Sequence, residues 1–327
     1  MYTIPYLQSL ISTEIEQEII RINTTEPQNL YKPVGYALSM GGKRLRPVMV
    51  LLAYNLFGDE IEKAFPVAKA IEVFHNFTLL HDDIMDKAEM RRNSPSVYKK
   101  YNENVAILSG DAMSIMGYNY LLSCDSPASD AMIRLFSQTA LEVCEGQQYD
   151  MDFENRMDVT IPEYLTMIRL KTAVLLACSL KIGALAANAP LQIADLLYDF
   201  GLNLGIAFQL QDDLLDVYAD QKKFGKKIGG DITSNKKTFL LLKALELADD
   251  PTRSVMMNWI TRTEFDAQEK IKVIKCIYNE LDIKKITEIC IDEYYQAALK
   301  VWRSIDLNNE KKNELLLLAE MIMNRDY

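Results

Sequence analysis

The sequence predicts an all-α protein, and three observations support this class. Glycine and proline are scarce: 13 glycines and 10 prolines make up about 7% of the 327 residues, against roughly 12% in an average protein. Apolar residues recur at helical spacing over long segments, whereas the alternation typical of a strand is missing. Repeats with a period of roughly 20 to 50 residues are also missing. Turns should therefore be few and helices long.

Composition narrows the class of protein further. The 36 basic and 46 acidic residues give a formal charge of −10, which argues against a nucleic-acid-binding protein, because phosphate neutralisation needs a basic face. A local basic patch is still compatible with this charge. The 327 residues could form one large domain or two, and a hydrophobic content of 49% suffices for a sizeable core.

The cysteines and the termini indicate a cytoplasmic protein. The five cysteines are an odd number without Cys-x-x-Cys spacing, as expected of small core residues in a reducing compartment. Apolar runs stay below the ~18 residues that span a bilayer, and the N-terminus lacks the pattern of a secretory signal. We expect no stable membrane insertion, although an apolar substrate could still come from or go to a membrane.

In chain order, helical periodicity predicts a series of helices. The predicted helices are Leu7–Ile22, Lys32–Met40, Pro47–Phe57, an apolar helix through Ile71–Asp86, Val105–Leu122, Ala128–Asp150, Tyr164–Ala187, Leu191–Val217 and three or four more within Phe239–Tyr327. A polar break is expected at Asn23–Pro33. Gly41 and Gly42 should end the second helix, because glycine most easily takes the left-handed conformation found at helix ends.

Three cations follow the glycine pair within four residues, namely Lys43, Arg44 and Arg46. Pro47 then opens the next helix. Backbone N–H groups at a helix N-terminus together with fixed cations suit a phosphate group. A solvated turn is the simpler reading of this segment taken alone.

The central feature is the stretch His81–Asp86, which reads His-Asp-Asp-Ile-Met-Asp at the end of the apolar helix. Residues four apart lie on one helix face, so Asp82 and Asp86 point into the same space while Asp83 points to the side. His75 lies seven residues before Asp82 and hence on nearly the same face. It could be a ligand-binding residue or simply a hydrogen-bonded core histidine.

A second acidic stretch has the same spacing. Gln209, Asp212, Asp213 and Asp216 stand at steps of three and four in another apolar helix, so the two stretches could form facing walls of one cavity. Acidic residues usually mark the solvent face of a helix, but duplication in an apolar frame favours a site. Carboxylates held together bind a cation or take up protons, and oxygen ligands without cysteine or paired histidine favour Mg²⁺.

Further polar residues stand where packing alone would not place them. Arg91 and Arg92 follow the first acidic stretch and form plain ion pairs or hold the outer oxygens of a diphosphate. Lys171 and Thr172 interrupt an apolar helix, and a buried lysine requires a partner. Tyr218–Thr238 is rich in glycine and lysine, as expected of a loop that closes over an anion or of a solvated loop.

The order of these motifs resembles the trans-isoprenyl diphosphate synthases (polyprenyl synthetases). The resemblance covers roughly residues 30 to 240 and rests on Gly41-Gly42-Lys43-Arg44-Leu45-Arg46-Pro47, Asp82-Asp83-x-x-Asp86 with Arg91-Arg92, Lys171-Thr172, Phe208-Gln209-x-x-Asp212-Asp213-x-x-Asp216, Gly225-Lys226 and Lys236-x-Thr238. It implies the isoprenoid synthase fold for residues 1–327, a single-domain helical bundle around a deep central cavity. It also implies a homodimer and head-to-tail 1′-4 condensation of isopentenyl diphosphate onto an allylic diphosphate (dimethylallyl, geranyl or farnesyl).

The resemblance also assigns roles by motif. Asp82, Asp86 and Asp212 would bind several Mg²⁺ ions, with Asp83, Asp213 and Asp216 in support. Arg91, Lys171, Lys226 and Lys236 would hold the allylic diphosphate, and Lys43, Arg46, His75 and Arg92 would hold isopentenyl diphosphate. Lys171, Thr172 and Gln209 would act at the reacting centre, where the carbonyl dipole of Gln209 and the hydroxyl of Thr172 can face a carbocation while metal and cations stabilise the diphosphate anion.

Two positions depart from the family pattern. Asn93 follows the arginine pair and Asn235 precedes Lys236, each where the family usually has glycine. Asparagine tolerates the left-handed conformation, so we expect the local geometry to survive.

Product length should depend on the residues one helical turn below Asp82, which are Phe77 and Thr78. A large aromatic residue here, with no insertion between Asp82 and Asp86, resembles short-chain enzymes that make C15 or C20 products, and C20 is slightly favoured. The alternatives are a long-chain synthase, a terpene cyclase or a non-catalytic partner subunit of the same fold, a phosphohydrolase that uses both acidic stretches, and a binding module without catalysis. A cyclase needs no site for a second substrate, and a silent subunit tends to lose its aspartates.

Overall fold

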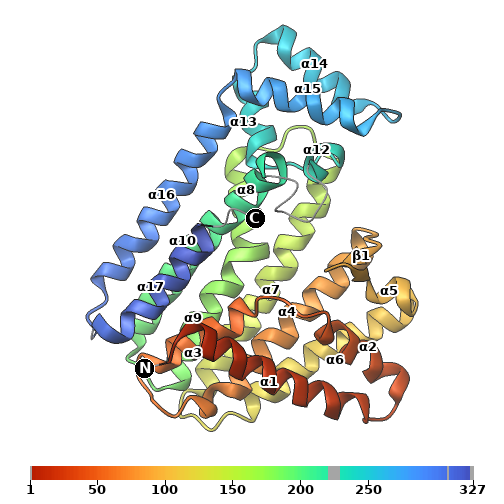
Figure 1. Ribbon diagram of the computed structural model, residues 1–327. Coiled ribbons are helices and arrows are strands. Elements are labelled where there is room, and N and C mark those ends of the chain that lie inside the picture. The colour runs from red at the N-terminus through yellow and green to blue at the C-terminus, as the bar shows by residue number, and fades with distance from the viewer. Residues whose placement is uncertain (1, 220–228, 308, 325–327) are drawn as a thin grey trace. The chain divides into compact units, whose positions relative to one another are not determined.

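The computed structural model describes residues 2–219, 229–307 and 309–324. It is 79% helical, which confirms the all-α class. Among the described residues the only strands are β1 (Met90–Arg91) and β2 (Ser94–Pro95), a short antiparallel hairpin that the sequence did not predict (Figure 1). No helix of the described part combines the length and apolar character needed to cross a membrane.

The chain divides into two compact units. Unit 1 consists of Met1–Gln138, Cys178–Tyr198 and Asp306–Leu316, and unit 2 consists of Thr139–Ala177, Asp199–Ile305 and Leu317–Tyr327. The first acidic stretch therefore belongs to unit 1 and the second to unit 2. The single-domain organisation expected from the sequence stays a prediction.

Unit 1 contains most of the elements of the N-terminal half. They are α1 (Ile4–Asn23), α2 (Gln28–Ser39), α3 (Leu45–Asn55), the 3₁₀ turn η1 (Ile61–Ala64), α4 (Phe65–Met85), β1, β2, α5 (Val97–Lys100) and α6 (Glu103–Leu122). The α4 helix packs most extensively against α6. Every residue of α3 from Pro47 to Asn55 is buried, so α3 lies at the centre of this core.

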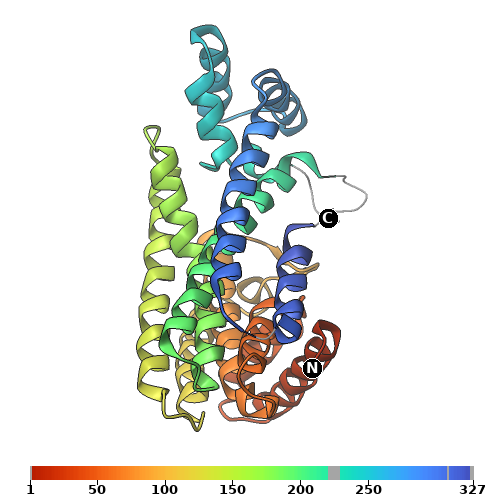
Figure 2. The ribbon, with the colours of Figure 1, turned by 90° about the vertical axis from the view of Figure 1, so that its left-hand side faces the viewer.

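Unit 2 holds the second set of helices. They are α8 (Ile161–Ile168), the π-helical turn η2 (Arg169–Ala173), α12 (Gly230–Thr233), α13 (Phe239–Leu247), α14 (Asp250–Thr261), α15 (Ala267–Glu280) and α16 (Ile283–Ser304). Four further helices have residues in both units: α7 (Ser129–Glu154), α9 (Val174–Ala186), α10 (Leu191–Tyr218) and α17 (Asn309–Met323). Figures 1 and 2 draw α14 and α15 as neighbours, and the two helices are in contact.

Two details of the predicted helix pattern were wrong. The α2 helix begins at Gln28 and not at Lys32 as predicted. Pro33 was expected to end a loop, but it lies inside the helix and is buried. Its missing N–H removes one helical hydrogen bond, a loss that tertiary burial offsets. From Phe239 on, the described residues contain five helices, not three or four. The sequence analysis overlooked two helix starts, which are marked by the N-cap residues Asp249 and Asp266.

Candidate active site

The first acidic stretch closes helix α4. The backbone N–H of Lys87 donates to the carbonyl of Ile84 (3.2 Å), and that of Ala88 donates to the carbonyl of Asp83 (2.9 Å). Lys87 has φ 52°, so the end has the bonding of a Schellman motif with a lysine in the left-handed position. The helix thus ends at Met85, and Asp86 is its C-cap residue.

Arg91 binds two of these carboxylates. Its guanidinium donates to Asp83 Oδ1 from Nε (2.9 Å) and Nη2 (2.6 Å), and to Asp82 Oδ2 (3.2 Å). Asp83 is only 2% exposed, and burial raises its pKa while Arg91 opposes that shift. Asp83 is therefore buried and paired with Arg91, and its supporting role in metal binding stays a prediction.

Arg91 and Arg92 are adjacent in sequence, but their side chains have different partners because the two residues occupy different positions in the β1–β2 hairpin. Arg91 lies on β1 and pairs with Ser94, whereas Arg92 and Asn93 form the two-residue loop, with φ of 51° and 62°. Positive φ at both loop residues matches the type I′ turn of tight hairpins. The expected left-handed tolerance of Asn93 is thus confirmed.

Arg92 reaches the glycine turn after α2. Its guanidinium donates to the carbonyl of Gly41, and a methyl group added at Gly42 would lie 2.7 Å from the guanidinium carbon. Gly41 and Gly42 have φ of 78° and 126°, which confirms their predicted role as a left-handed helix end. The backbone conformation of Gly42 favours glycine there, and a side chain at this position would also displace the guanidinium of Arg92.

The three cations that follow the glycine turn differ in burial. Arg44 is buried and forms an ion pair with Glu72, while its Nη2 donates to the carbonyl of Leu38 (2.7 Å). Arg44 therefore braces the fold, so only Lys43 and Arg46 of the three cations are placed to meet an anion. The side chain of Lys43 is exposed.

His75 lies beside Arg46. Their side chains are 3.1 Å apart, from Arg46 Nη1 to His75 Nε2. Burial holds the pKa of His75 well below its usual value, and the guanidinium groups of Arg46 and Arg92 lower it further. The imidazole is therefore neutral at pH 7, and its Nε2 accepts the proton of Arg46. The structure brings together His75, Arg46 and Arg92, three of the four residues predicted to hold isopentenyl diphosphate.

Phe77 and Thr78, which are predicted to limit the product length, lie on α4 together with His75. The ring of Phe77 lies 4.8 Å from that of His81 and 5.3 Å from that of Phe74, which in turn packs against Phe136 at 5.0 Å. Phe77 is thus part of an aromatic cluster in unit 1. The hydroxyl of Thr78 donates to the carbonyl of His75 within the helix (2.8 Å).

In unit 2 a continuous chain of hydrogen bonds joins residues from two of the predicted motifs. The hydroxyl of Thr172 donates to Gln209 Oε1 (2.9 Å), Gln209 Nε2 donates to Asp213 Oδ1 (2.8 Å), and the hydroxyl of Tyr164 donates to Asp213 Oδ2 (2.7 Å). Burial raises the pKa of Asp213 to about 6 against the opposing charge of Lys236. Sequence reasoning missed Tyr164, whose apolar neighbours mark it only as a core residue.

Lys171 and Thr172 sit in the π-helical turn η2. π-helical turns are rare in proteins, and those that occur are often found at functional sites. Two glycines allow neighbouring helices to approach the turn: a methyl group at Gly146 of α7 would collide with the backbone N of Lys171, and one at Gly205 of α10 would lie 2.6 Å from Ala173 Cα. Lys171 is half-buried, and its Nζ donates to Asp150 Oδ2 (2.6 Å), which gives the partner expected of a lysine in an apolar helix.

A further carboxylate lies next to the second acidic stretch. The backbone N–H of Asp231 donates to Asp216 Oδ2 (3.0 Å). Burial raises the pKa of Asp231 to about 7, Lys236 lowers it, and Asp213, Asp216 and Asp212 raise it further. Burial would raise the pKa of Asp150, but the positive charges of Lys171 and, to a smaller extent, Lys236 lower it below its usual value. Asp231 and Asp150 were missed as site residues because neither belongs to a motif with helical spacing. Lys226 lies outside the described residues.

The donor set of both acidic stretches suits a hard cation. Within the described residues, however, no three His, Cys, Asp or Glu side chains are gathered closely enough to hold a metal ion. Each stretch by itself offers carboxylate oxygens, the ligands that a hard cation prefers, with Arg91 beside the first stretch in unit 1. The residues present are therefore compatible with Mg²⁺.

Comparison with known proteins gives the family. The polyprenyl synthetase model matches residues 27–280. A short chain isoprenyl diphosphate synthase of Methanocaldococcus jannaschii is 34% identical over 97% of this chain and 95% of its own. A geranylgeranyl diphosphate synthase of Methanosarcina mazei is 36% identical over 93% and 92%. A crystal structure of a geranylgeranyl pyrophosphate synthase superimposes with TM-score 0.93, at 43% identity and 99% coverage of both chains.

The chain thus belongs to the polyprenyl synthetase family, whose members use divalent metals. Within that family it is a prenyltransferase of the short-chain, geranylgeranyl or farnesyl diphosphate synthase type. The resemblance drawn from the motif order is confirmed, and so is the prenyltransferase class.

Proposed function

We propose that this chain condenses isopentenyl diphosphate head to tail with an allylic diphosphate and releases diphosphate. The observation that carries the proposal is the network of unit 2, in which Thr172 of one motif and Gln209 and Asp213 of another form one hydrogen-bonded chain. The family to which the chain belongs supports the same reaction.

The motif pattern of the family assigns both acidic stretches to the allylic diphosphate. Asp82, Asp86 and Asp212 would hold Mg²⁺, with Asp83, Asp213 and Asp216 in support. When bound, the metal neutralises charge on the leaving diphosphate. Arg91 and Lys171, each paired with a carboxylate, and Lys236, which lies near Asp231, would exchange part of these contacts for diphosphate oxygens. Lys226 is assigned to the same group from its motif.

Isopentenyl diphosphate would bind in unit 1 at the glycine turn. Lys43, Arg46 and Arg92 supply three positive charges there, and the neutral His75 is placed to donate or accept a hydrogen bond without a fourth charge. This site favours a synthase over a terpene cyclase, since a cyclase has no second diphosphate substrate to bind.

The carbocation formed by loss of diphosphate needs groups that stabilise it without attacking it. Thr172 suits this role: its proton is directed to Gln209, so the lone pairs of its oxygen are available. The released diphosphate would be the base that removes the proton after condensation. The lone pair of His75 Nε2 already accepts a hydrogen bond from Arg46, and His81 Nε2 contacts the carbonyl of Ile107 (3.2 Å).

We infer a short-chain product, C20 ahead of C15, because a large aromatic residue, Phe77, stands about one helical turn before Asp82 and packs against Phe74 and His81. A homodimer is also inferred. Leu108, Ile115 and Leu122 recur at seven-residue steps on one face of α6 and are each more than half exposed (59%, 62% and 65%). Exposed apolar stripes of this kind mark protein interfaces. The cytoplasmic location stays a prediction.

Product analysis tests the proposal. Purified enzyme is incubated with isopentenyl diphosphate and either dimethylallyl, geranyl or farnesyl diphosphate, with Mg²⁺ or with a chelator, and dephosphorylated products are separated by chromatography. We expect C20 alcohol and diphosphate release that requires isopentenyl diphosphate and disappears with chelator. Diphosphate release without isopentenyl diphosphate would indicate a phosphohydrolase, and products of C30 or longer would indicate a long-chain synthase.

A further inference from the structure

Lys270 on α15 is a charged residue almost fully removed from solvent, with 1% of its surface exposed. Its ammonium group donates to Asn235 Oδ1 (2.6 Å) and to the backbone carbonyl of Thr233 (3.3 Å). It also lies 4.2 Å from the ring centre of Phe265. A buried ammonium group is costly unless it is hydrogen-bonded, and both hydrogen bonds go to one short segment, the turn at residues 230–236.

This segment is a Schellman turn that ends α12. The N–H of Asn235 donates to the carbonyl of Ile232 (3.3 Å), and the N–H of Lys236 donates to the carbonyl of Asp231 (3.0 Å). Asn235 occupies the left-handed position with φ 56°. The turn therefore fixes the backbones of Asp231 and Lys236 next to each other.

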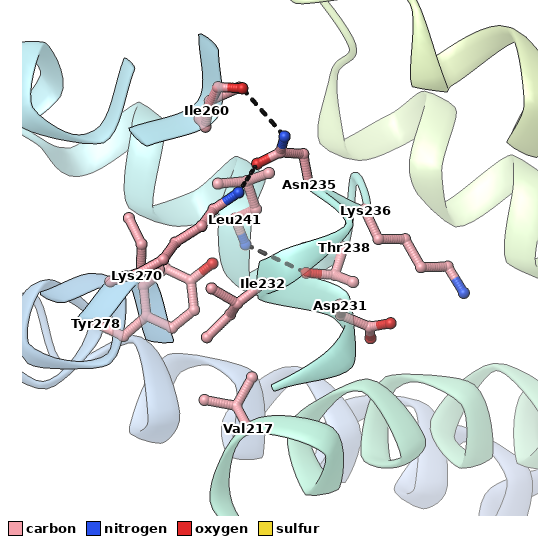
Figure 3. Close-up of a pocket in the computed structure, with 11 residues that line it drawn as sticks. Val217, Asp231, Ile232, Asn235, Lys236, Thr238, Leu241, Ile260, Lys270 and Tyr278 are labelled. Atoms are coloured by element: carbon pink, nitrogen blue, oxygen red, sulfur yellow. Dashed lines mark hydrogen bonds between the residues drawn. The ribbon is translucent and has the colours of Figure 1, made fainter. Parts of the chain in front are cut away.

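Asparagine adds to this turn what glycine could not. Asn235 Nδ2 donates to the carbonyl of Ile260 on α14 (3.0 Å) while its Oδ1 accepts from Lys270 on α15. Figure 3 shows Asn235 facing Ile260 and Lys270, whereas the side chains of Lys236 and Asp231 extend from the other side of the turn. One side chain thus anchors the turn to two helices, and the opposite side carries the charged groups.

We propose that Lys270 and Asn235 are positioning residues that hold the Asp231–Lys236 turn in register with the second acidic stretch. Neither touches substrate. The link to that stretch is the hydrogen bond from the N–H of Asp231 to Asp216. The inference rests on the proposed function, in which Lys236 holds the allylic diphosphate.

The test compares three variants with one control. Lys270→Met removes the charge at nearly constant length, Asn235→Gly keeps the left-handed conformation but removes both side-chain hydrogen bonds, and the double variant combines them. Lys272→Met removes an exposed charge from the same helix and serves as the control. For each, kcat, the KM of both substrates and the melting temperature are measured.

We expect Lys270→Met and Asn235→Gly each to raise the KM of the allylic diphosphate about tenfold, as loss of a hydrogen bond to a charged group would. The KM of isopentenyl diphosphate should stay unchanged, and the double variant should be no worse than the more affected single variant, because both remove the same link. A lower melting temperature with wild-type KM values would overturn the inference. If Lys270→Met does not fold, the KM of the allylic diphosphate in Asn235→Gly tests the inference by itself.

Lys236→Ala separates this inference from the proposed function. If it raises the KM of the allylic diphosphate while Lys270→Met and Asn235→Gly do not, only the positioning role fails. If Lys236→Ala itself leaves that KM unchanged, the proposed role of Lys236 fails, and the positioning role fails with it.

Discussion

The hydroxyl of Thr172 and the amide of Gln209 are joined by a hydrogen bond of 2.9 Å in which the hydroxyl is the donor. Asp213 sets this direction. It accepts a hydrogen bond from Gln209 Nε2, so Gln209 Oε1 faces Thr172. An electron-rich oxygen is therefore presented by Thr172 rather than by Gln209 alone.

Replacing Thr172 by valine should lower kcat about tenfold or more, with little change in either KM. Valine keeps the shape and removes the oxygen, and the stabilisation lost is one that matters when positive charge develops. Single-turnover kinetics measures the chemical step directly. Thr166→Val, which removes an exposed hydroxyl that donates to the carbonyl of Pro162 on α8, is the matched control. Equal effects of the two substitutions would contradict the role of Thr172.

Asp212→Asn should lower kcat at least about a hundredfold and shift the dependence on Mg²⁺ to higher concentration, because one anionic ligand is lost. Asp199→Asn removes an exposed carboxylate from the same helix, α10, and should change neither quantity. Activity is followed by diphosphate release over a Mg²⁺ titration. A wild-type Mg²⁺ dependence in Asp212→Asn would remove this residue from the metal site.

His75 should make stability fall in mild acid. Its pKa in the folded chain lies below the ordinary 6.5, so the unfolded chain binds the proton first as the pH drops through that value. Below about pH 6.5 the free energy of unfolding then decreases, by at most about 1.4 kcal/mol per pH unit for one proton. The raised pKa values of Asp213 and Asp231 act in the opposite direction.

Comparison with His75→Gln isolates this contribution, since the carboxylates are common to both proteins. Urea unfolding at several pH values between 5 and 7.5 should give a shallower loss of stability on acidification for the variant. Parallel curves would mean that His75 is not held neutral.

Phe77→Ala should lengthen the product by one or more C5 units. The substitution opens the aromatic cluster between His81 and Phe74 without touching a charged group. Chromatography of dephosphorylated products gives the chain length. An unchanged product with wild-type turnover would show that another residue limits elongation.

Ile115→Glu should turn the homodimer into a monomer, because it places a charge in the middle of the apolar stripe of α6. Light scattering coupled to size-exclusion chromatography measures the mass. Ile20→Glu is the control, since Ile20 is an isoleucine of similar exposure (67%) on α1. A wild-type enzyme that runs as a monomer would contradict the dimer itself.

The sequence by itself determined the helical class, the family and most of the residues that gather in each unit. Motifs with helical spacing are readable because one helix fixes their relative positions, as for Asp82 and Asp86 or Gln209 and Asp213. Conformational preference was readable too: Gly41, Asn93 and Asn235 all have positive φ.

Only the tertiary structure decided which partner each charged group has. Arg44 looked like its neighbours Lys43 and Arg46, yet it turns inward to Glu72. Asp150, Tyr164, Asp231 and Lys270 carry no motif, and their roles arise from contacts between residues 15 to 49 positions apart. Periodicity reports which face of one helix a residue occupies, but burial and hydrogen bonding across helices depend on how different helices pack, which no local pattern encodes.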